Sequence, residues 1–172
     1  DDSILAAIGG VIAPIFAPLG WGNWKMAVAA VTGLIAKENV VATFGVLFGF
    51  AEVAEDGAEI WGTLATTMTA VAAYSFLVFN LLCAPCFAAM GAIKREMNNT
   101  KWFWFAIGYQ TLLAYVVSLC VYQIGTLVTT GAFGVGTVVA FLFIIGFIYL
   151  LFRPYKESET LEVHMKGMAG AK

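Results

Sequence analysis

The sequence has little charge, and this scarcity excludes an ordinary soluble domain. Only 12% of its 172 residues are Asp, Glu, Lys or Arg, while 61% are hydrophobic. Soluble domains carry about 25% charged and about 45–50% apolar residues. The mean hydropathy of +0.87 agrees with this contrast. The composition therefore indicates a membrane protein.

Two long stretches, residues 60–93 and 102–152, contain no charged side chain. A spanning helix needs about 20 such residues. Residues 138–152 are apolar all round, whereas the strands of a membrane barrel alternate apolar and polar residues. We therefore expect an all-α integral membrane protein, with a transmembrane helical domain over residues 1–155. The polar residues 156–172 are expected to form a disordered cytoplasmic tail.

Several motifs of nucleotide and metalloenzyme chemistry are absent from the sequence. It has no Gly-rich phosphate loop and no HExxH motif, and its single histidine, His164, lies in the polar tail. We therefore predict no catalytic residue, no resident cofactor and no nucleic-acid partner. The chain begins at Asp1 without a Met or a basic signal region, and we expect it to start inside a longer polypeptide.

The apolar residues divide into about five transmembrane or re-entrant segments, some broken at proline or polar residues. The first contains Pro14 and Pro18, and a proline in a helix interior costs about 3 kcal/mol; we expect a short or broken helix there. The third is too long for one straight span and is interrupted at Pro85. Lys94, Arg95 and Lys101 predict a cytoplasmic loop and, with it, a cytoplasmic C-terminus. The segments are 4–19, 26–50, 61–93, 102–127 and 135–152.

One candidate site is the only charged pair in the second segment, Lys37 and Glu38. Charges at membrane depth cost about 2.5–3.5 kcal/mol each and commonly mark function. With Gly33 before the pair and Asn39 after it, the pattern predicts an interrupted helix that presents Glu38 and Asn39 oxygens to a cation. Alternatively, Lys37 and Glu38 pair structurally or extend toward a membrane surface.

A second candidate site lies around Pro85. Pro85 has no N–H to donate to the Leu81 carbonyl, which is left free. Cys86 would add a soft sulfur ligand, and thiolates favour transition metals. An ordinary proline kink with small neighbours is the alternative. For Cys83 and Cys120 we expect packing roles. A polar set on the fourth segment is expected to join helices; it comprises Gln110, Thr111, Ser118 and Gln123.

As a set, four segments resemble the C-terminal part of the membrane domain of FeoB-type ferrous iron transport proteins, its second Gate segment. They are residues 3–10, 32–41, 85–89 and 105–111. The resemblance implies Fe(II) as a transported substrate and a bacterial inner membrane, with Glu38 and Cys86 on the iron pathway. Asn39 departs from the small or β-branched residue expected there, and could add an oxygen.

The resemblance also implies an N-terminal GTPase domain and a first Gate half in the same protein. The protein is expected to contact the lipid bilayer and to form a homo-oligomer. Two other functions stay open. The chain could be a structural or oligomerisation bundle that transmits the GTPase state without binding iron. It could also belong to a transporter of organic, nucleoside-like solutes.

Overall fold

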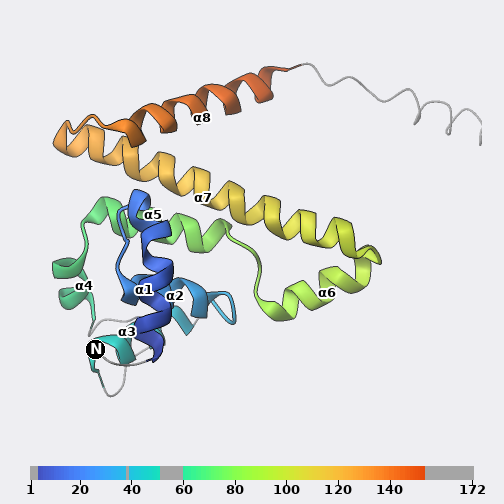
Figure 1. Ribbon diagram of the computed structural model, residues 1–172, viewed down its shortest axis with the longest axis horizontal. Helices are drawn as coiled ribbons and strands as arrows, with labels where there is room; N and C mark the ends of the chain where they lie inside the picture. The colour runs from blue at the N-terminus through green and yellow to red at the C-terminus, as the bar shows by residue number, and fades with distance from the viewer. Residues whose placement is uncertain (1–3, 38, 51–59, 154–172) are drawn as a thin grey trace, which may run out of the picture.

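The computed structural model describes residues 4–37, 39–50 and 60–153. These residues form eight α-helices and one 3-10 helix, and no strand occurs among them (Figure 1). Three of the helical stretches are long and apolar enough to cross a membrane, or four if one bent pair is counted as a span. The predicted all-α membrane fold is therefore confirmed.

A sharp bend separates the first apolar segment from the second. Helix α1 (Ile4–Phe16) continues through Pro14, passes into a 3-10 turn, η1 (Ala17–Leu19), and is followed by α2 (Trp24–Gly33). The two arms are bent by 93°. The turn needs Gly20, whose φ of 85° is accessible to glycine at no steric cost. The interruption thus falls three residues later than Pro14, and α1 is the short helix that the prolines predict.

The second segment is interrupted between Gly33, which ends α2, and Asn39, which begins α3 (Asn39–Phe48). The Ile35 amide still bonds the Thr32 carbonyl at 2.9 Å, so a turn follows α2 before the chain changes direction. The Thr32 and Thr43 hydroxyls lie 3.0 Å apart and connect the two short helices. The interrupted helix predicted from the Lys-Glu-Asn sequence is present.

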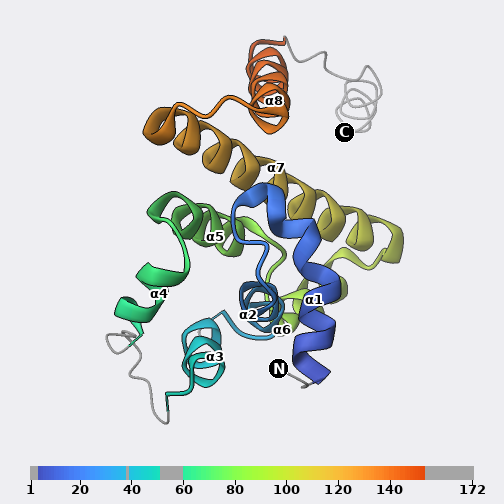
Figure 2. The same cartoon turned by 60° about the vertical axis from the view of Figure 1, so that its left-hand side comes forward.

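The third segment forms three helices: α4 (Trp61–Thr67), α5 (Ala70–Leu82) and α6 (Phe87–Met97). Helix α7 (Thr100–Thr130) starts at an Asn99 cap and ends at Gly131, and α8 (Val135–Phe152) follows. In both views α7 lies between α8 and the remaining helices (Figures 1 and 2). The last two helices match the predicted segments within three residues at each end.

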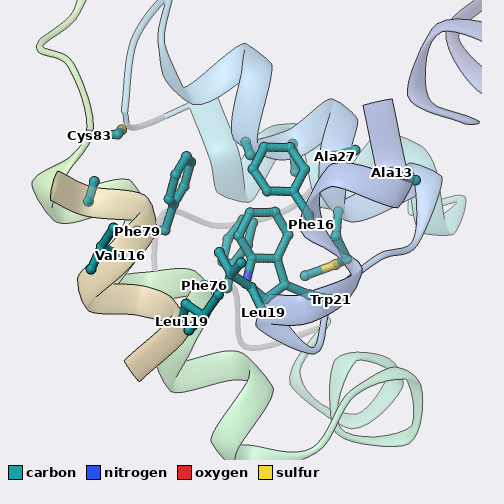
Figure 3. Close-up of a cluster of buried hydrophobic side chains, with 14 of the residues drawn as sticks. Ala13, Phe16, Leu19, Trp21, Ala27, Phe76, Phe79, Cys83, Val116 and Leu119 are labelled. Atoms are coloured by element: carbon teal, nitrogen blue, oxygen red, sulfur yellow. The ribbon is translucent and has the colours of Figure 1, made fainter. Parts of the chain in front are cut away.

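The core lies where η1 meets α5 and α7. Trp21 is 2% exposed and stacks on Phe16, with ring centroids 4.3 Å apart, and the edge of Phe76 meets it at 5.1 Å (Figure 3). Aromatic contacts of this kind stabilise beyond the area they bury. This cluster holds the 93° bend between the first and second segments against the long helices.

Two buried serines provide the polar centre of this core. The Ser75 and Ser118 hydroxyls lie 2.8 Å apart, and Ser118 Oγ also donates to the Ser75 carbonyl at 2.7 Å. Trp21 Nε1 donates to Ser75 Oγ at 3.4 Å. Gln123 Nε2 donates to the Pro18 carbonyl at 3.0 Å. Ser118 and Gln123 thus join helices as predicted, whereas Thr111 bonds the Ile107 carbonyl of its own helix.

Candidate functional site

The candidate site begins with the interruption between α5 and α6. The Cys83 amide still closes the helix by bonding the Phe79 carbonyl at 2.8 Å, but the chain then runs extended to Cys86. Pro85 cannot donate to Leu81, so that carbonyl has no partner from its own helix. In a membrane such an oxygen needs another donor.

Lys37 supplies that donor from the other interruption. Its Nζ lies 3.3 Å from the Leu81 carbonyl oxygen, across 44 positions of sequence. The α2–α3 break and the α5–α6 break therefore meet in space. The sequence around Lys37 does not predict Leu81 as its partner, because the contact depends on how the two broken segments pack together.

The same two segments approach closely at Gly33. A Cβ atom added there would lie 3.1 Å from Asn80 Oδ1 and 2.7 Å from Val40 Cγ2. Asn80 is held by its own helix, since Nδ2 donates to the Phe76 carbonyl at 2.9 Å. Glycine is thus needed to bring the end of α2 against α5, where the Asn80 amide oxygen faces it.

A thiol lies beside these oxygens. Cys83 is 2% exposed, and its Sγ donates to the Asn80 carbonyl at 3.3 Å. Figure 3 shows Cys83 at the edge of the buried cluster, beyond Phe79. The break region therefore combines an ammonium, the Leu81 carbonyl that it bonds, an amide oxygen and a sulfur.

The three ligands predicted from the sequence, Glu38, Asn39 and Cys86, do not form one described cluster. Cys86 is half-buried and lies immediately before α6. Asn39 is exposed at the start of α3 and lines a cavity of about 320 Å³ with Thr32 and Thr43. Glu38 lies outside the described residues. Within the described ranges, no three His, Cys, Asp or Glu side chains are grouped closely enough to hold a metal.

Sequence reasoning missed Asn80 and assigned Cys83 to packing alone. A signal for Asn80 was present, because it is the only Asn or Gln in the charge-free residues 60–93. It also directly precedes Leu81, the residue whose carbonyl Pro85 leaves free. An isolated amide next to a proline-freed carbonyl is a pattern that points to a polar site.

The fold and the two facing breaks define the class of protein: an all-α membrane protein whose interrupted helices meet at a polar site. A family model described as "Gate: Nucleoside recognition" matches residues 1–100. This match covers more than half of the chain, and the chain belongs to the Gate family.

Curated relatives give a more specific likeness. The chain is 40% identical to the Fe(2+) transporter FeoB of Methanocaldococcus jannaschii over 126 residues, 73% of this chain and 18% of the relative. It is 34% identical to the Fe(2+) transport protein A/Fe(2+) transporter FeoB fusion protein of Porphyromonas gingivalis over 74% of this chain and 16% of the relative.

The Fe(2+) transporter FeoB of Staphylococcus aureus strain COL is 30% identical over 74% of this chain and 18% of its own length. The chain thus spans less than a fifth of the length of these relatives. The predicted resemblance to the membrane part of FeoB proteins is confirmed. The comparison with solved structures found no match.

Proposed function

We propose that the chain is part of a Fe(II) uptake transporter and that its two facing helix breaks contribute to the permeation pathway of the inner membrane. The observation that carries the proposal is the Lys37–Leu81 contact, which joins the breaks at 3.3 Å. Irregular backbone at membrane depth is tolerated where it is buried in protein or lines a polar cavity. Transporters build cation sites from such discontinuous helices.

The ligand chemistry of the breaks suits Fe(II). The Leu81 carbonyl and Asn80 Oδ1 are hard oxygen donors, whereas Cys83 and Cys86 carry soft sulfur. Iron in its ferrous state accepts mixed oxygen, nitrogen and sulfur ligands, while Mg and Ca select oxygen alone. The names of the FeoB relatives support iron as the transported substrate.

The predicted ligands take roles along the same pathway. Glu38 follows Lys37 and would supply a carboxylate beside the breaks. Asn39 would supply an amide oxygen at the start of α3, and Cys86 a thiol at the start of α6. Fe(II) is cargo in this scheme, and each ligand holds it only in transit.

The charged ends of the spans support an orientation of the chain in the membrane. Lys94 and Arg95 end α6, Lys101 lies in the first turn of α7, and Arg153 caps α8. These ends lie toward one side of the molecule in Figure 1. Because cytoplasmic loops carry excess Lys and Arg, this side is cytoplasmic in the proposal. Fe(II) then enters from the opposite side of the membrane in the proposal.

The remaining parts of the proposal concern the rest of the protein. A GTP-binding domain and a first Gate half, outside this chain, would control and complete the pathway, in a homo-oligomer. This chain itself would carry out no catalysis. Its polar residues 156–172 would lie in the cytoplasm in the same orientation.

Transport of a nucleoside-like solute is the second candidate, because the family description names nucleoside recognition. A nucleoside needs several convergent hydrogen-bonding groups in its pocket. The cavity of about 670 Å³ between α5, α7 and α8 is lined instead by mostly apolar side chains such as Val71, Val117 and Ile144. This chemistry favours iron over the organic solute.

The test is Fe(II) uptake by the intact protein in proteoliposomes under anaerobic conditions. We expect the double variant Glu38→Ala, Cys86→Ser to lose most of the uptake. Cys120→Ser is the control, because the Cys120 thiol donates its hydrogen bond to the Ala140 carbonyl of α8, at 3.7 Å. Unchanged Fe(II) uptake and affinity in the double variant would support a scaffold role, and uptake of nucleosides without Fe(II) would support the second candidate.

A further inference from the structure

Lys37 has a role in the break region that packing does not explain. Its side chain is exposed, and among the described residues its ammonium donates one hydrogen bond, to the Leu81 carbonyl. An ammonium has three N–H donors, and a charge at membrane depth is costly. A neutral donor such as glutamine would bond the carbonyl without that cost. The positive charge itself therefore needs an explanation.

The ammonium bonds a backbone carbonyl oxygen, a type of group that also binds metal cations. The Leu81 carbonyl is free of its helix only because of Pro85, and Cys83 and Asn80 lie next to it. These carbonyl, amide and thiol groups carry no net charge, but their oxygen and sulfur atoms have partial negative charge that attracts a cation. Lys37, on a long flexible stem, can approach and leave them without moving the helices.

We propose that the Lys37 ammonium takes the place of a metal cation at the Leu81 carbonyl oxygen and is displaced when a divalent ion passes. Lys37 then lowers the affinity of the breaks for metal and speeds its release, because two cations cannot share the same oxygens. This role rests on the proposed function, since it assigns regulation to the same site.

The physical basis is like-charge repulsion at short range. A unit charge and a divalent ion a few ångströms apart repel by several kcal/mol even at an effective dielectric constant of about 20. Side-chain movement relieves much of this repulsion. A change of about tenfold in affinity, equal to about 1.4 kcal/mol, is thus within the available energy.

The test separates the charge from the hydrogen bond. Lys37→Gln keeps an N–H donor for the Leu81 carbonyl but removes the charge, whereas Lys37→Arg keeps the charge. Lys25→Gln is the matched control, because the Lys25 ammonium lies over the Phe48 ring, 4.7 Å from its centroid, away from the freed carbonyl. Fe(II) binding to the intact purified protein and Fe(II) uptake in proteoliposomes are measured for each.

We expect Lys37→Gln to bind Fe(II) about tenfold more tightly and to turn over more slowly, since release becomes limiting. Lys37→Arg and Lys25→Gln should stay within about twofold of the unsubstituted protein. Lys37→Met is the second charge-free variant, used if Lys37→Gln does not purify as a folded protein, and it should show the same tighter binding.

Two outcomes overturn the inference, and they are distinguishable. If charge-free variants bind Fe(II) equally or more weakly while the unsubstituted protein transports it, Lys37 is a structural clamp and the transport proposal stands. If the unsubstituted protein neither binds nor transports Fe(II), the proposed function fails, and the role of Lys37 fails with it.

Discussion

The serine core and the paired breaks satisfy their polar groups in opposite ways. Ser75 and Ser118 are fully buried, and Ser75 Oγ contacts Trp21, Ser118 and the Leu19 carbonyl. Lys37 is exposed, and within the part of the chain that the structure describes its ammonium has one hydrogen bond, to Leu81. Redundant hydrogen bonds make the core a rigid frame. A single contact that is easily exchanged suits a site through which an ion passes.

This comparison predicts the largest loss of stability at Trp21. Trp21→Ala removes a 2% exposed ring that stacks on Phe16. We expect a loss of about 3 kcal/mol in the free energy of unfolding, as for other buried aromatic truncations. Thermal unfolding of the intact protein in detergent measures it, with Trp104→Ala, at a 65% exposed position, as the control. Equal losses in the two variants would contradict a core centred on Trp21.

A smaller loss is expected at the serine pair. Ser75→Ala removes the hydroxyl that accepts from Trp21 and bonds Ser118 at 2.8 Å. Hydrogen bonds between membrane helices are worth about 0.6–2 kcal/mol. The same unfolding assay should show a loss in that range, while Thr129→Ala, whose hydroxyl bonds only its own helix and its neighbour Thr130, should show almost none. If Ser75→Ala leaves the free energy of unfolding unchanged, the stability of the core does not depend on the serine pair.

At the breaks, stability should change little while transport changes. Pro85→Ala supplies an N–H that can bond the Leu81 carbonyl and compete with Lys37. We expect the free energy of unfolding to change by less than about 1 kcal/mol, because neighbouring helices already satisfy the break. Fe(II) uptake should fall, because the Leu81 carbonyl would then bond an amide of its own continuous helix. Full uptake in this variant would show that the freed carbonyl has no part in transport.

The last expected difference is one of accessibility among the three cysteines. Cys86 is half-buried, whereas Cys83 and Cys120 are 2% and 8% exposed. Thiol reactivity requires access, so a maleimide should label Cys86 first in single-cysteine variants of the intact protein. Mass spectrometry of the labelled protein gives the order. Fast labelling of Cys83 would indicate that the α5–α6 break opens to the surroundings.

Local patterns predicted most of the helices. Residues 135–152 form α8 at the predicted bounds because an unbroken apolar run is flanked by Gly134 and Arg153. The interruptions after Gly33 and before Pro85 follow from polar and proline residues, whose effect on a helix is local. Pro14 was less informative, since a proline near the end of a helix leaves α1 intact to Phe16.

The candidate site could be predicted only in part. The residue types predicted each of the two breaks by itself. That the breaks contact each other depends on packing between residues that are 44 positions apart. For the same reason Asn80, which faces Gly33, was not identified. Glu38 lies outside the described residues, and its role, like those of Asn39 and Cys86, stays a prediction.

The unequal lengths of α7 and α8 have a consequence for how the molecule sits in a bilayer. At 1.5 Å per residue, the 31 residues of α7 extend about 46 Å and the 18 residues of α8 about 27 Å. The hydrocarbon layer is about 30 Å thick. An upright α8 therefore just matches it, while α7 tilts or projects beyond it, in keeping with the divergence of the two helices in Figure 1. A thicker bilayer would draw α7 toward the membrane normal, so lipid chain length acts on the angle between the two helices.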